Sequence, residues 1–98
     1  MYNYIELTDR FYYDNRLEKL NQDGLSESPA LINVHQLDCV YRTKYKGQHR
    51  DVFLIVFKFK HDEFWSYAMR FISEYKRDEH FNRIRRKLIK RNSIVKRK

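Results

Sequence analysis

The hydrophobic pattern is clearest between residues 37 and 60. Over residues 37–46 apolar and aromatic positions alternate with polar ones, and residues 52–60 are rich in β-branched and aromatic side chains. A period of two is typical of a half-buried strand. Residues 47–51 lie between the two segments and are suited to a turn. The pattern therefore predicts an antiparallel β-hairpin with a five-residue loop.

The same alternation predicts the register of this hairpin. The pairs expected on its core face are Tyr45 with Phe53, Thr43 with Ile55, and Tyr41 with Phe57. The other face carries Val52, Leu54 and Val56 among cations. Because an isolated two-stranded hairpin is marginally stable in water, these three residues need cover from another element or from a second subunit. This need favours a homodimer.

A first helix is predicted over residues 9–22. Thr8 or Asp9 is a suitable N-cap, and Asp23-Gly24 is a stop signal. The residues that share one face of this helix are Tyr13, Leu17 and Leu20. Residues 4–8 before it are expected to form a short strand. Ser28-Pro29 after it is expected to start one helical turn through Leu31.

A second, longer helix is predicted over residues 62–91. Asp62 is its expected N-cap, and Glu63 complements the positive end of the helix dipole. Apolar side chains recur at helical spacing over residues 64–75 and again over residues 81–88. The charged segment between them is consistent with a continuous helix or with a break near Asp78.

These elements together predict an α+β fold. It consists of an N-terminal helix, an antiparallel β-hairpin or three-stranded sheet, and a long basic C-terminal helix packed on the sheet. Residues 1–91 are expected to form a single domain, since 98 residues provide one modest core. Residues 92–98 are expected to fray as a basic tail.

Charge is distributed unevenly along the chain. The formal net charge is +8, with −3 over residues 1–34, +4 over residues 35–60 and +7 over residues 61–98. Residues 81–98 include nine Lys or Arg and no Asp or Glu. This distribution indicates a polyanionic partner for the C-terminal part of the chain.

A helical wheel separates the apolar and basic residues of this C-terminal segment. Phe81, Ile84 and Leu88 cluster on one side, and Arg83, Arg86, Lys87 and Lys90 cluster nearly opposite, with Arg85 and Arg91 at the borders. Like charges four residues apart repel by about 0.2–0.5 kcal/mol per pair in a helix. An outward row of cations without acidic partners therefore favours nucleic-acid binding over a bland solvated face, because arginine forks and lysine amines suit phosphate oxygens.

The hairpin carries further cations that extend this predicted interface. The predicted nucleic-acid-binding residues are Arg83, Arg86, Lys87, Lys90 and Arg91 on the helix, and Arg42, Lys44, Lys46, Lys58 and Lys60 on the hairpin. Lysines on exposed strands also prevent edge-to-edge aggregation, so a protective role stays open for the second group. The tyrosines at positions 2, 4, 12 and 13 are candidates for stacking on unpaired bases, although packing in a core or an interface is favoured.

No residue pattern indicates a cofactor, a metal or a catalytic site. The four histidines at positions 35, 49, 61 and 80 are dispersed, without the short spacing of a metal-binding pair. The two glycines at positions 24 and 47 do not form a phosphate-binding loop, and no serine nucleophile motif occurs. The expected function is therefore binding rather than catalysis.

One enzyme hypothesis stays open. In size, charge and the expectation of a basic sheet, the chain resembles in general character the small ribonucleases of the RelE-like toxin type. This resemblance implies a site in which Tyr45, His49, Arg50 and Lys58 act as acid, base and phosphate clamps. No motif of that family matches residue by residue, so the resemblance is one of general character.

Further features bear on location and on the alternative to nucleic acid. Cys39 is the lone cysteine, the longest apolar run covers residues 52–57, and no signal peptide is evident, so a cytoplasmic protein is expected. A composition rich in Lys, Asn, Ile, Tyr and Phe is typical of an AT-rich genome and suggests a viral or mobile-element protein in a host cytoplasm. The alternative function is binding or inhibition of an acidic protein partner. The primary expectation is a small DNA- or RNA-binding protein with weak or no sequence specificity.

Overall fold

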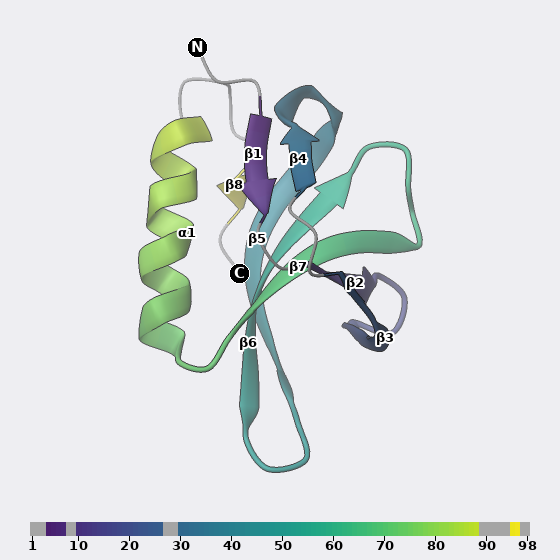
Figure 1. Cartoon of the computed structure of the whole chain (residues 1–98), viewed down its shortest axis with the longest axis vertical. Helices are drawn as coiled ribbons and strands as arrows, with labels where there is room; N and C mark the ends of the chain where they lie inside the picture. The colour runs from purple at the N-terminus through teal and green to yellow at the C-terminus, as the bar shows by residue number, and fades with distance from the viewer. Residues whose placement is uncertain (1–3, 8–9, 27–29, 89–94, 97–98) are drawn as a thin grey trace.

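Strands dominate the fold, which is seen in a computed structural model describing residues 4–7, 10–26, 30–88 and 95–96. The strands are β1 (Tyr4–Leu7), β2 (Arg10–Asp14), β3 (Lys19–Ser26), β4 (Ala30–Asn33), β5 (Leu37–Lys46), β6 (Asp51–Phe59), β7 (Trp65–Phe71) and β8 (Val95–Lys96). A short 3₁₀ helix, η1 (Val34–Gln36), precedes β5, and one α-helix, α1 (Glu74–Leu88), follows β7 (Figure 1).

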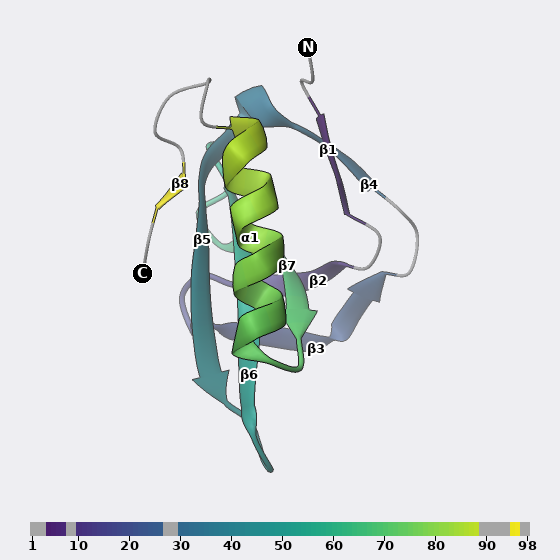
Figure 2. The same ribbon diagram turned by 90° about the vertical axis from the view of Figure 1, so that its left-hand side faces the viewer.

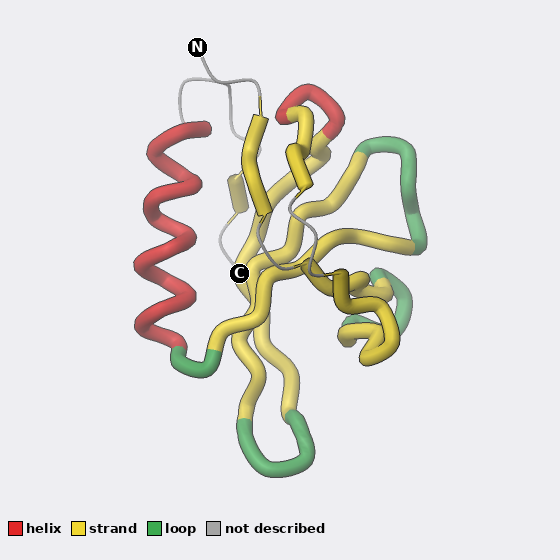
Figure 3. The backbone as a smooth tube through the Cα atoms, viewed as in Figure 1, coloured by secondary structure: helices red, strands yellow, loops and turns green. Residues whose placement is uncertain are grey.

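The strands form two sheets. The larger sheet has the order β3-β2-β7-β6-β5-β8, and the smaller one pairs β1 with β4. The pairs in both sheets are antiparallel, except that β8 runs parallel to β5. Helix α1 lies along one face of the larger sheet, and the β1–β4 sheet lies beside it on the same side (Figures 1 and 2). Figure 3 shows that the loops drawn in green are short connections between successive elements.

The larger sheet is covered on the face that α1 occupies, here called the outer face. Its buried apolar cluster joins residues of β1, β4, η1, β5 and β6 to residues of α1: Ile5, Leu7, Ile32, Val34, Leu37, Val40, Ile55, Phe57, Phe81, Ile84 and Leu88. Fully burying an aliphatic or aromatic side chain contributes about 1.5–3 kcal/mol. This cluster therefore fixes the position of α1 on the sheet.

The opposite face, here called the inner face, is covered by the sheet's own curl. Its buried cluster consists of Phe11, Tyr13, Leu20, Leu54, Val56 and Ala68. Small side chains line the curl at β7, where Ser66 and Ala68 are 1% and 0% exposed. The curl brings Tyr13 of β2 to Tyr41 of β5, and burial followed by the neighbouring Tyr41 raises the pKa of Tyr13 well above its usual value. Both faces of the sheet therefore carry a core.

The predicted α+β fold is wrong, because the described residues are mostly β and form a six-stranded and a two-stranded sheet in place of a hairpin or three-stranded sheet. The predicted helix over residues 9–22 is not present in its described part, residues 10–22. Tyr13 and Leu20 are opposite each other in the β2–β3 hairpin. The chain reverses at Asp14, whose carboxylate accepts hydrogen bonds from the backbone N–H groups of Arg16 and Leu17 at 2.9 and 3.1 Å. Glu18 completes the turn with a left-handed φ of 55°. A local carboxylate-capped turn replaces the helical turn.

The predicted C-terminal helix is also too long at its start. Residues 65–71 form β7, which pairs with β2 on one side and β6 on the other. Asp62 does cap a turn, since its carboxylate accepts from the N–H groups of Phe64 and Trp65 at 3.0 and 2.9 Å, but that turn leads into a strand. The helix begins at Glu74, and the Ser73 hydroxyl accepts from the N–H of Lys76 at 3.1 Å. It is continuous through Asp78.

The central hairpin is present, but the predicted register is wrong by one residue. Tyr45 pairs with Val52, Thr43 with Leu54, and Tyr41 with Val56. The connection has four residues rather than five, and the N–H of Gly47 donates to the carbonyl of Arg50 at 2.9 Å. Because both faces of β6 are buried, alternation alone does not fix the register.

This register changes the argument for a homodimer. Leu54 and Val56 lie on the inner face and contact Phe11, Tyr13 and Leu20 of the same chain. The cover that these residues need is thus supplied within one chain. A second subunit is not required for it.

The remaining predictions concern the two ends of the chain. The first strand is confirmed as β1. The turn expected from Ser28 to Leu31 is wrong where the structure describes it, since Ala30–Asn33 is β4, and residues 28–29 lie outside the described residues. In the predicted tail, Val95–Lys96 forms β8 against Val40 and Tyr41 of β5. Among the described residues, no helix is long and apolar enough to cross a membrane.

Candidate nucleic-acid interface

Helix α1 presents one apolar and one basic side, and the apolar side rests on the sheet. Phe81, Ile84 and Leu88 are 1%, 5% and 1% exposed. They recur every three or four residues, which is the spacing of a single helical face. The opposite side of the helix therefore faces outward.

The outward side carries the predicted cations. Arg83, Arg86 and Lys87 are exposed. Arg83 is paired with Glu79, one turn before it, at 3.0 Å. Within the described part of the chain, Arg86 and Lys87 make no ion pair, and neither does the half-exposed Arg85. Lys90 and Arg91 lie outside the described residues.

Asp14, a carboxylate of the N-terminal third, does not neutralise these cations. Asp14 pairs with Arg16 at 3.3 Å. Burial by itself would raise the pKa of Asp14, but hydrogen bonds from the Arg16 side chain and from the N–H groups of Leu17 and Arg16 outweigh it and lower the pKa. Among the described acidic residues, Glu79 is the one that forms an ion pair with a cation in the C-terminal half of α1. It therefore reduces the positive charge of this surface.

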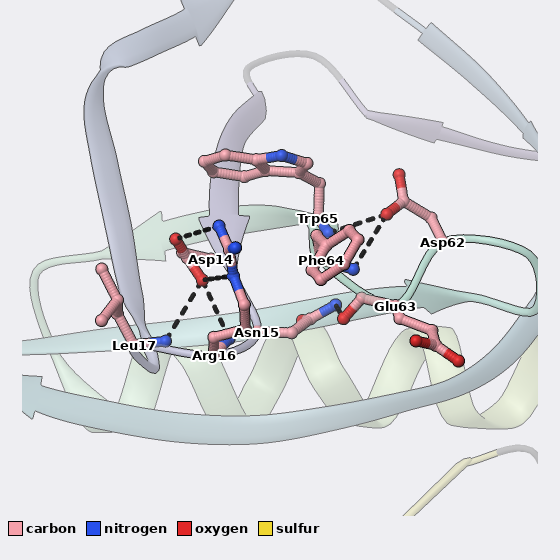
Figure 4. Close-up of polar contacts among 8 residues, drawn as sticks. All are labelled: Asp14, Asn15, Arg16, Leu17, Asp62, Glu63, Phe64 and Trp65. Carbon is pink, nitrogen blue, oxygen red and sulfur yellow. Dashed lines mark hydrogen bonds and ion pairs between the residues drawn. The ribbon is translucent and has the colours of Figure 1, made fainter.

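The turn that Asp14 caps is anchored to the loop before β7 (Figure 4). The N–H of Asn15 donates to the carbonyl of Phe64 at 2.9 Å, and its side-chain amide donates to the carbonyl of Glu63 at 3.1 Å. The Ser66 hydroxyl donates to the Asn15 side-chain oxygen at 2.7 Å. The acidic residues of this region therefore serve local turns at the edge of the sheet.

Arg42 belongs to the fold rather than to an open interface. Its guanidinium pairs with Asp78 at 3.1 Å and lies 4.8 Å from the centre of the Phe81 ring. Its side chain is 22% exposed. Both contacts join β5 to α1, so Arg42 is held against the helix and is poorly placed to receive a phosphate.

Arg77 was missed as a structural residue by the sequence analysis. It is 7% exposed, and its guanidinium donates to the carbonyl of Thr43 at 2.9 Å. It also pairs with Asp78 at 3.0 Å and with Glu74 at 3.5 Å, and it lies 5.4 Å from the Phe53 ring centre. Position 77 precedes Phe81 by one turn, which is the signal that placed it on the buried side of the helix.

The hairpin cations do not form one surface. Lys44 and Lys46 are exposed near the turn and alternate in phase with Arg42, so they share the outer face with α1. Lys58 is opposite Cys39 at the far end of β6. Lys60 follows β6, and its N–H donates to the carbonyl of Gln36 at 2.9 Å. The structure thus brings Lys44 and Lys46 together and separates Lys58 and Lys60 from them.

The tyrosines that were candidates for stacking on bases are also not all on one surface. Tyr13 is 2% exposed and belongs to the inner core, whereas Tyr4 and Tyr12 are 56% and 38% exposed. The ring of Tyr12 meets the rings of Tyr67 and Trp65 edge-on, with centroids 5.6 and 6.4 Å apart. Tyr2 lies outside the described residues. Tyr12 is therefore packed laterally, with part of its ring open to solvent.

The residues implied by the ribonuclease resemblance do not converge. His49 and Arg50 are exposed in the hairpin turn. Tyr45 is opposite Val52, and Lys58 is six residues further along β6. At about 3.3 Å per residue, this separates Lys58 from the Tyr45–Val52 pair by about 20 Å. The four side chains do not make a common catalytic site in this arrangement.

His80 lies on α1, three residues before Arg83 and seven before Lys87. Burial, then the positive charges of Arg83 and Lys87, lower the pKa of its imidazole. The ring lies 5.4 Å from that of Phe71. Its protonation therefore reports on the electrostatic potential at the outward side of α1.

The described residues offer no group of three or more His, Cys, Asp or Glu side chains that could hold a metal ion. Comparison with known proteins adds no relative to this description. No family model, no curated protein and no solved structure matches the chain.

Proposed function

We propose that this protein binds nucleic acid through the outward side of the C-terminal half of α1, with weak or no sequence specificity. The observation that carries the proposal is the set of exposed or half-exposed cations Arg85, Arg86 and Lys87, which lack an acidic partner among the described residues. They project from a helix whose other side is held in the core by Phe81, Ile84 and Leu88.

Helix α1 needs no rearrangement to bind phosphates. A helix fixed on a sheet presents its cations in a constant geometry, so little conformational entropy is lost when phosphates bind. Arginine forks bind phosphate oxygens in pairs, and the lysine supplies a mobile point charge. The same cations lie near the negative, C-terminal end of the helix dipole, and each stabilises the helix by about 0.3–1 kcal/mol. A binding assay must therefore be accompanied by a stability measurement.

The test is fluorescence anisotropy with labelled duplex and single-stranded DNA and RNA over a range of salt concentrations. If about five phosphates of duplex DNA are engaged, log K falls with log[salt] at a slope of about −4 to −5. Replacing Arg86 and Lys87 together by Gln is expected to reduce that slope by about two and the affinity at low salt by about tenfold or more. The control is Lys19→Gln, which removes one exposed positive charge on β3, and its effect is compared with half of the effect of the double variant.

His80 provides a readout that is specific to this surface. A polyanion bound at Arg83 and Lys87 offsets their positive charge, so the pKa of His80 is expected to rise on binding, as followed by NMR titration of the imidazole. An unchanged pKa of His80 in the saturated complex, together with full affinity of the Arg86→Gln/Lys87→Gln variant, would show that nucleic acid binds elsewhere or not at all.

An acidic protein partner is the second candidate function, and one observation favours it. Ile72 and Tyr75, just before and within the first turn of α1, are 79% and 71% exposed. Exposed apolar and aromatic side chains beside cations are typical of protein interfaces. Purification with and without nuclease separates the two functions, since co-purified nucleic acid raises the 260/280 nm absorbance ratio and a single acidic polypeptide does not.

We place this binding protein in the cytoplasm, which would be a host cytoplasm for a viral or mobile-element protein. The support is Cys39, the one cysteine of the sequence, whose buried thiol suits a reducing compartment.

A further inference from the structure

The β5–β6 hairpin extends beyond the rest of the larger sheet. The last pair that β6 makes with β7 joins Phe53 to Phe71, whereas β5 and β6 remain paired as far as Lys46 and Asp51. Figures 1 and 2 show the turn projecting past the helix and past all other strands. The segment beyond Phe53, residues 44–52, is here called the ribbon. From Phe53 to Asp51 the strand projects about 7 Å, at about 3.3 Å per residue, and the turn over residues 47–50 lies beyond it.

The ribbon is positively charged at its tip. Lys44, Lys46 and Arg50 are exposed, and one acidic residue, Asp51, lies among them. Asp51 is within 3.8 Å of Lys44. Lys46 and Arg50 make no ion pair with any residue that the structure describes. The tip thus carries two cations without an acidic partner, at the part of the molecule farthest from its cores.

We propose that the ribbon enters the major groove of duplex DNA while the cations of α1 contact the phosphates. This inference rests on the proposed function and adds the form of nucleic acid and the second contact. The major groove of B-DNA is about 12 Å wide and 8.5 Å deep, and it admits a two-stranded β-ribbon. About 7 Å of strand with the turn at its end is comparable to the depth of the groove, so the tip can reach the base edges. The major groove of A-form RNA is too narrow for side chains to read.

The two basic regions are held at a fixed separation. Arg77 joins them, because its guanidinium bonds the carbonyl of Thr43 at the base of the ribbon. From Arg77 the helix rises about 14 Å to Arg86, and from Thr43 the strand extends about 13 Å to Gly47. The two paths run in opposite directions (Figure 1). The cations of α1 and of the tip therefore lie about 27 Å apart, which corresponds to about eight base pairs at 3.4 Å each.

The experiment compares three single-charge variants, Lys46→Gln, Arg50→Gln and the control Lys19→Gln, on a 20-base-pair DNA duplex and on one of its strands. Each ribbon variant is expected to lower duplex affinity about threefold to tenfold, and the control less than twofold. On the single strand all three variants are expected to behave alike. Protection of guanine N7 from dimethyl sulfate is expected with the wild-type protein and is expected to be lost in the Lys46→Gln/Arg50→Gln variant.

The outcomes separate the two proposals. If the wild-type protein binds the duplex but both ribbon variants match Lys19→Gln, the ribbon does not contact DNA and the proposed function stands without it. If the ribbon variants lose as much affinity on the single strand, or if guanine N7 is unprotected, groove insertion is overturned. If the wild-type protein binds no nucleic acid, both proposals fail.

Discussion

The helix and the ribbon both present cations, but different forces hold those cations in place. On α1 the cations stand on a row of buried side chains that includes Phe81 and Leu88. On the ribbon no core lies behind Lys46 or Arg50, whose positions depend on the hydrogen bonds of the β5–β6 ladder and of the turn. Packing therefore fixes the first region, whereas the tip of the ribbon, beyond Tyr45 and Val52, which pack against the inner cluster, depends on backbone pairing. A change at the tip can be made without disturbing the helix.

The largest effect is expected from removing the side chain that joins the two regions. Arg77→Ala leaves the Thr43 carbonyl without its guanidinium donor and opens space beside Phe53, so the free energy of unfolding is expected to fall by about 3 kcal/mol. Urea denaturation measures this change. Arg77→Met restores the packing but not the polar contacts, and it is expected to recover about 1 kcal/mol.

The matched control is Glu74→Gln, because Glu74 pairs with the same guanidinium but is 59% exposed. Exposed ion pairs contribute little, so its effect is expected to be below about 0.5 kcal/mol. Equal stabilities of Arg77→Ala and the wild-type protein would mean that the helix and the ribbon are coupled by other contacts.

A smaller and more local effect is expected at the tip. A Cβ atom at Gly47 would lie 2.7 Å from the carbonyl oxygen of Arg50 and 3.2 Å from Cγ2 of Val52. Gly47→Ala must therefore displace backbone, with an expected loss of about 1–2 kcal/mol. NMR chemical shifts are expected to change over residues 44–52 and to stay constant along α1. Gln48→Ala, an exposed neighbour, is the control, and shifts spreading to α1 would show that the two regions are not separable.

The smallest effect is expected from the acidic residue on the outward side of α1. Glu79→Gln removes the ion pair with Arg83, which lowers stability by about 0.3–0.5 kcal/mol. It also leaves the Arg83 guanidinium available for a phosphate and removes a carboxylate that would repel the phosphates. Nucleic-acid affinity is therefore expected to rise about twofold to threefold. Glu63→Gln changes the net charge equally at a distant exposed site. An equal rise in both variants would indicate a general charge effect rather than a contact at α1.

The elements that were predicted correctly have a hydrophobic pattern that fits only one type of secondary structure. The strands of the central hairpin and the C-terminal half of α1 are of this kind. Residues 9–22 are not, because Tyr13 and Leu20 are seven apart, which suits two turns of a helix and also two facing positions of a short hairpin. Leu17, expected on the helix face, is 63% exposed at the turn. The Asp14-Asn15 pair was the available turn signal.

Residues 64–72 show the same ambiguity. Phe64, Tyr67, Ala68 and Phe71 have helical spacing, but Trp65, Tyr67, Met69 and Phe71 also alternate. The strand forms because β7 has a partner on each side, and such tertiary pairing cannot be derived from local spacing. In the candidate site, the exposed cations of α1 were identified from the sequence. The engagement of Arg42 by Asp78 and Phe81 was not, since it depends on the register of β5.

The placement of the N-terminal segments on both faces of one sheet has a consequence for synthesis on the ribosome. Strand β2 pairs with β7, so Phe11 has Ala68 as its partner, more than fifty residues later. The first third of the chain emerges before either of its docking surfaces exists, since domains are translated from the N-terminus at about 5–20 residues per second. Its aromatic side chains therefore remain without their docking surfaces for several seconds.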